Sequence, residues 1–429
     1  MTMLLGRKDP VGAQGQESVV IGYDLDDYKA QISYCSVDSY EAETVSSVMG
    51  NQVYDIPAVL CKRLEVNQWY YGREALRQAE EGAGTLVEGL FDKARKGIPV
   101  IVEDEEYDPV LLLSLFVKKS LSILSAVVPL SKIEGVMFTT GEIDEQNVSI
   151  FKTIVEGISL KTENVFFQSH VESLFYYTIH QPKDVWNGQV LACEYEKDRM
   201  ITHRLMFNQN TTPIVSFSES EKYNNIEIGN KDRNFLNILH KNCDGRYVSS
   251  IQLIGNGYRE EWYKESLKFM CINRRVFAGN NLYSKGACYG MLEKISPSDV
   301  GKEYFYLGKD KLKANVGMNV TKRGQDSYLV LLNAGVNWYE TKAAAEFILA
   351  EDNELSFRIS SLTGNVVYDE TMVLDELPER KKGTTRIRVE MKMVSENTIW
   401  VEATDLGFGE FYPATGKKWE KEIVLEIKE

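Results

Sequence analysis

Three carboxylates lie at the end of the first apolar run of the sequence or shortly after it. The run Val19–Asp24 ends in Asp24 itself, and Asp26 and Asp27 come shortly after it. A carboxylate at the end of a buried strand can hold a magnesium ion through bound water. It can equally end the strand as a turn residue, because Asp accepts hydrogen bonds from nearby backbone N–H groups. Asp24 is therefore a candidate for a magnesium site or for a simple turn.

A glycine turn is the second candidate site. The apolar run Ser250–Ile254 leads directly into Gly255 and Gly257. Glycine lets backbone N–H groups approach phosphate oxygens without an intervening Cβ, and it also permits tight turns that involve no ligand. Both glycines are candidates for nucleotide contacts or for ordinary turn positions.

The four histidines do not form a recognisable site in the sequence. His170, His180, His203 and His240 are scattered, with no cysteine or carboxylate at the spacing of metal ligands or of a catalytic triad. We expect surface or core histidines. The sequence also lacks G-x-S-x-G, H-E-x-x-H and G-x-x-x-x-G-K-[ST] motifs. It therefore predicts no catalytic residue and no metal ligand, and its six separate cysteines are expected to be reduced core thiols.

The elements that would position these residues change in character along the chain. Val19–Asp24 and Lys29–Tyr34 read as a hairpin, and strands then alternate with helical stretches, among them Glu260–Phe269, as in an α/β domain. Beyond Ile295 short period-two runs take over, which indicates an all-β unit. We predict an extension over residues 1–17, an α/β domain over 18–295 and a β-sandwich over 308–429.

Composition narrows the classes of partner. Acidic residues outnumber basic ones by 63 to 49, a net charge of −14, which disfavours nucleic acid. The first residues do not form the apolar core of a signal peptide. The apolar stretch Val110–Leu130 has its hydrophobic residues at the spacing of a helix that is buried on one face. We therefore expect no membrane partner and a cytoplasmic location.

Taken in order, several segments resemble those of the DnaK-type heat-shock chaperones, members of the actin-like ATPase superfamily, over nearly the whole chain. Ile21–Leu25 looks like the first phosphate-loop strand, and Asp55–Val59 and Tyr71–Ala75 look like the segments that follow it. Leu253–Arg259 is similar to the adenosine motif V-G-G-S-T-R, and Gly286–Gly290 falls where the connector helix would be. The resemblance implies an α/β actin-like (ribonuclease H-like) ATPase-type domain in which Asp24, Gly255, Gly257 and Arg259 contact any bound nucleotide.

The β unit carries the more specific part of this resemblance. Phe347–Glu354 resembles F-S-T-A-x-D-N-Q, and Ile387–Leu406 resembles the hairpin that follows it in the family. A peptide-binding β-sandwich without the helical lid is implied, with an extended apolar peptide as its partner. With Asp352-Asn353 as the anchor, Phe347, Phe357 and Ile359 fall on groove-lining positions, although all three are equally compatible with the sandwich core.

The nucleotide motifs depart from the family pattern. Asp26-Asp27-Tyr28 replaces Gly-Thr-Thr, and Glu194–Arg199 replaces a glycine-rich second loop. A like-charge pair at 4 Å costs about 4 kcal/mol at an effective dielectric of 20, which a magnesium ion could offset. The span Val190–Ile254 is also short, so that one wall of the adenine pocket is expected to be reduced.

Two functions remain open from the sequence. The first is a chaperone-like peptide- or protein-binding protein whose nucleotide domain is degenerate and does not hydrolyse ATP. The second is a divergent actin-like ATPase that still takes ATP and magnesium as cofactors.

Overall fold

The computed structural model describes residues 18–425 apart from positions 49, 159, 161, 198, 351, 352 and 363–365, so the expected extension over 1–17 lies outside it. The chain divides into two compact units. The first comprises Met1–Glu142, Ile150–Ile214 and Ser218–Tyr304, and the second comprises Ile143–Ser149, Val215–Phe217 and Phe305–Glu429. The main division, after Tyr304, falls between the expected limits at residues 295 and 308.

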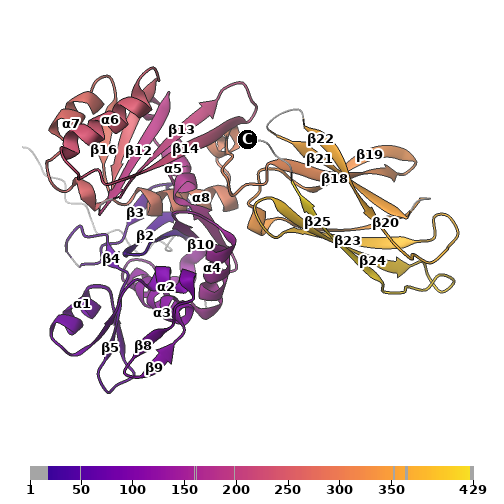
Figure 1. The fold of residues 1–429 in the computed structure, drawn as a ribbon, viewed down its shortest axis with the longest axis horizontal. Helices are drawn as coiled ribbons and strands as arrows, with labels where there is room; N and C mark the ends of the chain where they lie inside the picture. The colour runs from indigo at the N-terminus through magenta and orange to yellow at the C-terminus, as the bar shows by residue number, and fades with distance from the viewer. Residues whose placement is uncertain are drawn as a thin grey trace, which may run out of the picture. The chain divides into compact units, whose positions relative to one another are not determined.

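The first unit begins with a mixed sheet of strand order β11-β10-β1-β2-β3, with β4 added beside β2 (Figure 1). Its strands are β1 (Val19–Leu25), β2 (Lys29–Ser36), β3 (Ala42–Thr44), β4 (Ile56–Pro57), β10 (Ile133–Thr140) and β11 (Val165–Ser169). β1 pairs antiparallel with β2 and parallel with β10, and β10 pairs parallel with β11. The predicted hairpin is confirmed, and the parallel strands bring their carboxyl ends to one edge of the sheet.

A second sheet has the order β16-β15-β12-β13-β14-β17, and its first five strands repeat the order of the first sheet. Its strands are β12 (Gln189–Glu196), β13 (Arg199–Asn208), β14 (Ile214–Asn224), β15 (Val248–Ile254) and β16 (Arg275–Ala278). The senses repeat too, since β12 pairs antiparallel with β13 and parallel with β15, and β15 pairs parallel with β16. Two copies of one topology therefore make up most of the unit.

Two helices, α5 (His170–Ile179) and α8 (Leu282–Ile295), lie between the two sheets (Figure 1). α8 packs its buried Ala287 and Leu292 against the first sheet, while Tyr283 packs with Leu174 of α5 and Ala192 of β12 in the second sheet. The helices cross closely, because a Cβ on Gly286 would overlap the carbonyl oxygen of Ser173. The small residues of α8 are thus required by packing.

Further helices pack on the sheets. Phe151 of α4 (Glu145–Ile158) contacts Phe138 and Phe167 of the first sheet, and α6 (Lys231–Cys243) and α7 (Lys264–Met270) contribute side chains to the core of the second sheet. The short helix α9 (Asp299–Glu303) is followed by β17 (Tyr304–Tyr306). The helix predicted over Glu260–Phe269 was placed too early. The chain reaches α7 through a 3-10 turn, and the carboxylate of Asp232 accepts hydrogen bonds from the N–H groups of Glu265 and Ser266, which fixes where α7 begins.

A smaller α+β segment is inserted between β4 and β10. It contains β5 (Leu60–Arg63), β6 (Trp69–Tyr71), β7 (Gly84–Val87), β8 (Val100–Val102), β9 (Glu105–Tyr107), α1 (Gly72–Glu80), α2 (Leu90–Lys96) and α3 (Pro109–Leu121). Asp108 caps α3 by accepting from Val110 and Leu111, and a 3-10 turn continues to Ala126. Pro109–Ala126 is long and apolar enough to cross a membrane by length and composition, but half of it is buried, including the predicted stripe residues Leu113, Phe116, Val117 and Leu124.

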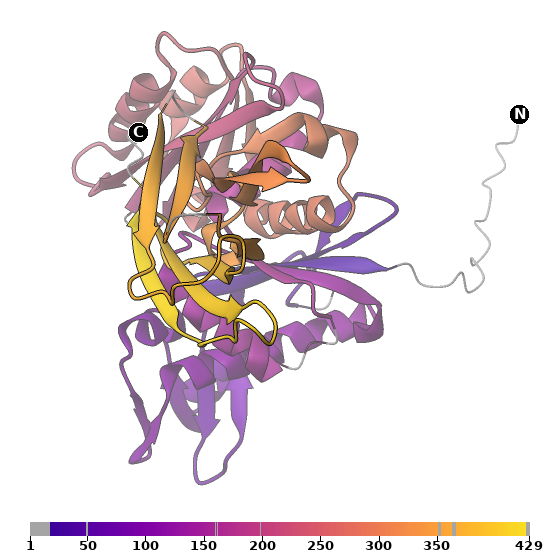
Figure 2. The same cartoon turned by 90° about the vertical axis from the view of Figure 1, so that its right-hand side faces the viewer.

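The second unit carries two four-stranded sheets, β19-β18-β21-β22 and β20-β23-β24-β25, drawn in orange and yellow in Figure 2. Their strands are β18 (Ala314–Lys322), β19 (Gln325–Leu332), β20 (Lys342–Ile348), β21 (Glu354–Ser361), β22 (Val367–Val373), β23 (Arg386–Met393), β24 (Thr398–Gly407) and β25 (Lys418–Val424). The predicted alternation in β23 is confirmed, since Ile387, Val389 and Met391 are all buried.

Candidate functional site

The carboxyl ends of β1 and β11 bring Asp24 and His170 together. Asp24 lies near the end of β1, and His170 is the first residue of α5, directly after β11. Their side chains are buried, and Asp24 Oδ1 lies 2.7 Å from His170 Nε2. The imidazole also stacks on Tyr283 of α8, with ring centroids 3.9 Å apart. Asp24 is therefore already engaged by a protein side chain.

Glu194 extends this cluster into the second sheet. It lies on β12 and accepts a 2.8 Å hydrogen bond from the hydroxyl of Tyr283. Glu194 Oε2 is 4.0 Å from His170 Nδ1 and 3.9 Å from His203 Nε2. A chain of polar side chains thus runs from the edge of one sheet to the edge of the other.

Burial and neighbouring charges shift the pKa values of His170, Glu194 and His203 in different directions. Burial lowers the pKa of His170, but the carboxylates of Asp24 and Glu194 outweigh it, and the net pKa is raised. Burial raises the pKa of Glu194, yet the charge of His170 reverses this and lowers it overall. Burial dominates at His203 and lowers its pKa to about 4. The two imidazoles therefore shift in opposite directions, and His203, with its pKa near 4, is neutral at pH 7.

Lys29 connects the two sheets at the rim of the cluster. Its Nζ lies 3.8 Å from Asp55 Oδ1 and 4.0 Å from Glu196 Oε1, and all three side chains are largely buried. Asp55 also accepts a 2.6 Å hydrogen bond from Gln31 and pairs at 3.5 Å with Arg259. Arg259, a predicted nucleotide contact, is thus mostly exposed and neutralises a carboxylate of the protein.

The last residues of β12 contact the turn after β15. Glu196 accepts hydrogen bonds from the backbone N and from Nδ2 of Asn256, each 2.7 Å long. Gly255 has φ +101°, and a Cβ there would overlap the carbonyl oxygen of Tyr195. A Cβ on Gly257 would overlap the Tyr195 ring. The requirement for glycine at both positions therefore comes from contact with Tyr195.

An aromatic cluster fills the space behind this turn. Tyr195 is fully buried and packs edge-on against Tyr258 and Trp262, with centroids 5.8 and 5.7 Å away. The indole of Trp262 donates to the carbonyl of Gly257. The ammonium of Lys231 lies over the rings of Tyr195 and Trp262. The protein's own rings and ammonium group occupy this side of the turn.

The carboxylate of Asp26, in the turn between β1 and β2, is also engaged by groups of the protein itself. Asp26 Oδ1 accepts from the backbone N–H groups of Tyr28 and Lys29, at 2.7 and 2.8 Å. Burial and the charge of Asp24 raise the pKa of Asp26 to about 7, and burial also raises the pKa of Asp27. An added polyphosphate would meet carboxylates that are already costly to ionise.

The histidines are core or surface residues, as expected, since His170 and His203 are buried and His240 is exposed. Each nevertheless has a carboxylate nearby, because His180 Nε2 lies 3.0 Å from Glu293 and His240 pairs with Asp244. The His170–Asp24 pair joins residues far apart in sequence, which spacing alone could not reveal. Among the described residues no group of three or more His, Cys, Asp or Glu side chains could hold a metal ion. The thiols are free and buried except that of Cys271, which is exposed, against expectation.

The expected peptide-lining residues of the second unit separate into two kinds. Phe357 and Ile359 lie on β21 with 0% and 1% of their surfaces exposed, so they belong to the sandwich core and do not line a groove. Phe347 is half-buried on the edge strand β20. Asp352, the anchor for these assignments, lies outside the described residues.

Comparison with known proteins divides the chain almost where the structure does. Residues 41–309 match a family of unknown function, the DUF5716 C-terminal family, and residues 311–425 match a domain of unknown function, DUF8552. No curated protein matches the chain. Since the first match covers more than half of its residues, the chain belongs to the DUF5716 C-terminal family.

Proposed function

We propose that this chain is an actin-like, chaperone-related interaction protein that binds a protein or peptide partner and does not hydrolyse nucleotide. Support for the actin-like relationship comes from the repeated sheet order, β11-β10-β1-β2-β3 and β16-β15-β12-β13-β14, with α5 and α8 between the sheets. Two ribonuclease H-like halves would produce such a repeat. The eight-stranded β unit that follows is compatible with a chaperone-type sandwich.

The single observation that carries the loss of nucleotide chemistry is the contact of Tyr195 with Gly255 and Gly257. In the proposed ancestry these glycines would face the adenosine. Here they accommodate a buried tyrosine of the neighbouring strand β12, and Glu196 accepts a hydrogen bond from the N–H of Asn256. Backbone donors and free space are both needed to cradle phosphate, and both are used internally.

The charges around Lys29 and His170 also disfavour nucleotide binding. Asp24, Asp26, Asp55, Glu194 and Glu196 surround Lys29 and His170, and Lys29 and His170 are paired with those carboxylates. A nucleotide phosphate would add negative charge to a site with an excess of it. Partner binding by the folded scaffold is the remaining role, in a cytoplasmic protein with neither membrane nor nucleic acid as partner.

For the β unit we place the peptide partner on an edge strand, because Phe357 and Ile359 are buried. β20 is an edge strand on which Phe347 is half-buried and Ile348 is 57% exposed. An extended apolar peptide can add to such an edge through main-chain hydrogen bonds, with alternate side chains giving specificity. Phe347→Ala should then weaken peptide binding without the stability loss expected from Phe357→Ala, which is about 3–5 kcal/mol.

A thermal-shift titration tests the absence of nucleotide binding. A ligand that binds the folded state raises stability by RT ln(1 + [L]/Kd). We expect Mg-ATP and Mg-ADP to leave the melting temperature of the full chain unchanged, and GTP, used as a parallel control, to do the same. A saturable rise that requires magnesium would favour the divergent ATPase instead.

A further inference from the structure

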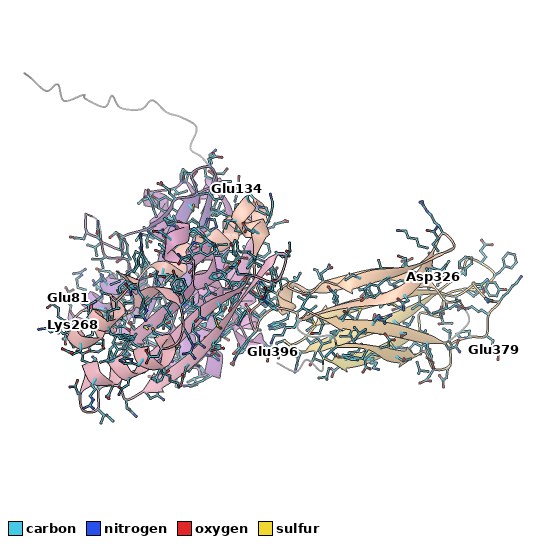
Figure 3. The ribbon with its side chains drawn as sticks, turned by 90° about the horizontal axis from the view of Figure 1, so that it is seen from above. Glu81, Glu134, Lys268, Asp326, Glu379 and Glu396 are labelled. Atoms are coloured by element: carbon cyan, nitrogen blue, oxygen red, sulfur yellow. The ribbon has the colours of Figure 1, made fainter. Side chains whose placement is uncertain are left out.

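A serine, a histidine and a glutamate follow one another across three adjacent strands of the second sheet. Ser220 is exposed on β14, and its Oγ lies 2.7 Å from Nδ1 of His203 on β13. The other ring nitrogen of His203, Nε2, lies 3.9 Å from Oε2 of Glu194 on β12. Figure 1 labels the three strands, and Figure 3 draws their side chains as sticks. The buried polar cluster therefore ends at an exposed hydroxyl group.

The pairing of β13 with β14 explains why Ser220 and His203 meet. The two strands are consecutive in the chain, adjacent in the sheet and joined by the turn over residues 209–213. Arg204 and Glu219, each one residue closer to that turn, also pair with each other. Opposed residues of adjacent strands have Cβ atoms about 5 Å apart, which puts a serine hydroxyl within reach of a histidine ring. The sheet itself thus holds the hydroxyl against the imidazole.

The imidazole of His203 is available to accept a proton. The charged groups that face it are Glu194, His170, Lys222 and Glu142. Burial is the largest influence and lowers the pKa of His203 to about 4, so the ring is neutral at pH 7 and carries one N–H. The carboxylate beside Nε2 favours the form with the proton on Nε2. Nδ1 is then the acceptor for the hydroxyl proton of Ser220.

Glu194 is held in place and ionised. Its Oε2 accepts a 2.8 Å hydrogen bond from the hydroxyl of Tyr283. Burial raises the pKa of Glu194, but the charges of His170 and His203 and this hydrogen bond lower it overall. A fixed carboxylate on the far side of an imidazole stabilises the positive charge that the ring gains when it takes a proton.

We propose that Ser220 is a nucleophile for acyl transfer from small activated esters, with His203 as its general base and Glu194 as a positioning residue. A nucleophile in hydrogen-bond contact with a base, which a third group orients in turn, is the arrangement that activates serine. This activity is separate from the proposed partner binding, because it needs only residues of the second sheet and the tyrosine that holds Glu194.

The reaction balances without a cofactor. The Oγ of Ser220 bonds to the carbonyl carbon of the ester while its proton passes to Nδ1 of His203. The bond from that carbon to the leaving oxygen then breaks, and the leaving oxygen takes the proton from His203. Water attacks the acyl-serine in the same way, so the carboxylic acid leaves and Ser220 regains its proton. Lys222, two residues beyond Ser220 on the same face of β14, supplies positive charge near the oxyanion.

The surroundings of Ser220 set the substrate class and the rate. Ser220 is exposed on a strand, so a small ester can approach from solvent. A base with a pKa near 4 takes a proton less readily than one with a pKa near 7. The gain from His203 should therefore be at the low end of general-base catalysis, about 100-fold.

Covalent labelling of the full chain with diisopropyl fluorophosphate, followed by peptide mass mapping, tests the nucleophile. We expect a label on Ser220, with release of fluoride. Ser220→Ala should remove this label, and Ser218→Ala, a matched change on the same face of β14, should leave it unchanged. His203→Gln should slow the labelling about 100-fold. With 4-nitrophenyl acetate as substrate, the part of the hydrolysis that depends on Ser220 should fall by the same factor.

The pH profile of labelling distinguishes base catalysis from simple exposure of the serine, and it needs only the wild type. Attack by unassisted serine alkoxide rises about tenfold for each pH unit. With His203 as the base, the rate should be level from pH 8 to about 5 and fall below that, as the ring becomes protonated near its pKa of about 4. Glu194→Gln should move this fall to lower pH, because the carboxylate raises the pKa of His203.

Three results would each overturn the proposal. The first is the lack of a label on Ser220, and the second is an unchanged labelling rate in His203→Gln. The third is a wild-type rate that rises about tenfold with each pH unit between 5 and 8, because Ser220 would then react without a base.

Discussion

Two buried charge clusters of this molecule are built in opposite ways. In the β unit, Arg380 and Asp405 form a bidentate pair at 2.6 and 2.7 Å, and hydrogen bonds from Gly407 and Thr415 also go to Asp405. In the first unit, Lys29 is 3.8 to 4.0 Å from two carboxylates. The first cluster is closely balanced, whereas the second has acid in excess.

This difference in charge balance shifts the pKa values of the carboxylates in the two clusters in opposite directions. Arginine holds the pKa of Asp405 far below its usual range, whereas burial and Asp24 raise the pKa of Asp26 to about 7. A balanced pair serves as a fixed brace. An excess of carboxylates around Lys29 instead makes that region sensitive to pH and unfavourable to an anionic ligand.

The largest effect is expected at the brace. Asp405→Asn leaves the buried Arg380 without its counter-charge, and removal of one partner of a buried ion pair costs about 3–5 kcal/mol. Denaturant unfolding of the full chain measures the loss. As a control, Lys418→Ala removes a lysine whose side chain is 58% exposed and which pairs with Glu402, and it should cost no more than about 1 kcal/mol.

The same pair predicts the behaviour in acid. Because the pKa of Asp405 is lower in the folded state, its contribution is complete above the unfolded value of about 3.9 and is lost as pH falls through the lower folded value. Wild type and Asp405→Asn should therefore converge in stability below about pH 4. Equal spacing of the two curves at every pH would show that the charge of Asp405 is unimportant.

A smaller effect is expected where α8 crosses α5. Gly286→Ala places a Cβ against the carbonyl of Ser173, and overpacking of this kind costs about 1–3 kcal/mol. Gly157→Ala is the matched control, because a Cβ there would make only ordinary contact with Ser114, and the helix should gain up to about 1 kcal/mol. Equal melting temperatures for both variants would contradict the close crossing.

The turn that contains Asp26 should respond to pH in the opposite sense to the Arg380–Asp405 pair. Since the pKa of Asp26 is raised, its protonated form favours folding, and stability is lost as pH rises from about 4 to about 7. Asp26→Asn can keep the acceptor for Tyr28 and Lys29 without the charge. It should melt above the wild type at pH 8, and the difference should shrink toward pH 4. A constant difference across this range would indicate that Asp26 titrates normally.

Much of the fold could be predicted from local patterns. The hairpin of β1 and β2, the alternating strand β23 and the buried stripe of α3 follow from side-chain period alone. The start of α7 could not be predicted, because Asp232 of another helix caps it. Phe357 was ambiguous since a groove position and a core position have the same alternation, and only packing separates them.

Less of the candidate site than of the fold could be predicted from the sequence. Asp24 and the glycines were found because strands end there, but the pairing of Asp24 with His170 depends on β1, β10 and β11 being parallel neighbours. A usable signal was present, since His170 directly follows a strand whose carboxyl end lies at the same sheet edge as Asp24. No pattern indicated that Tyr195 would occupy the space beside Gly257.

The central claim is that the protein's own side chains block the nucleotide site. Calorimetric titration of Mg-ATP into an Asp26→Gly, Asp27→Thr double variant tests it most directly. In the proposed chaperone relationship, this variant gives the turn after β1 the glycine and threonine of a phosphate loop, but Tyr195 and Glu196 still occupy the space and the donor at the turn after β15. We predict affinity no better than millimolar, or about −4 kcal/mol. Micromolar binding by the double variant would contradict the account, because the first loop alone would then control the site.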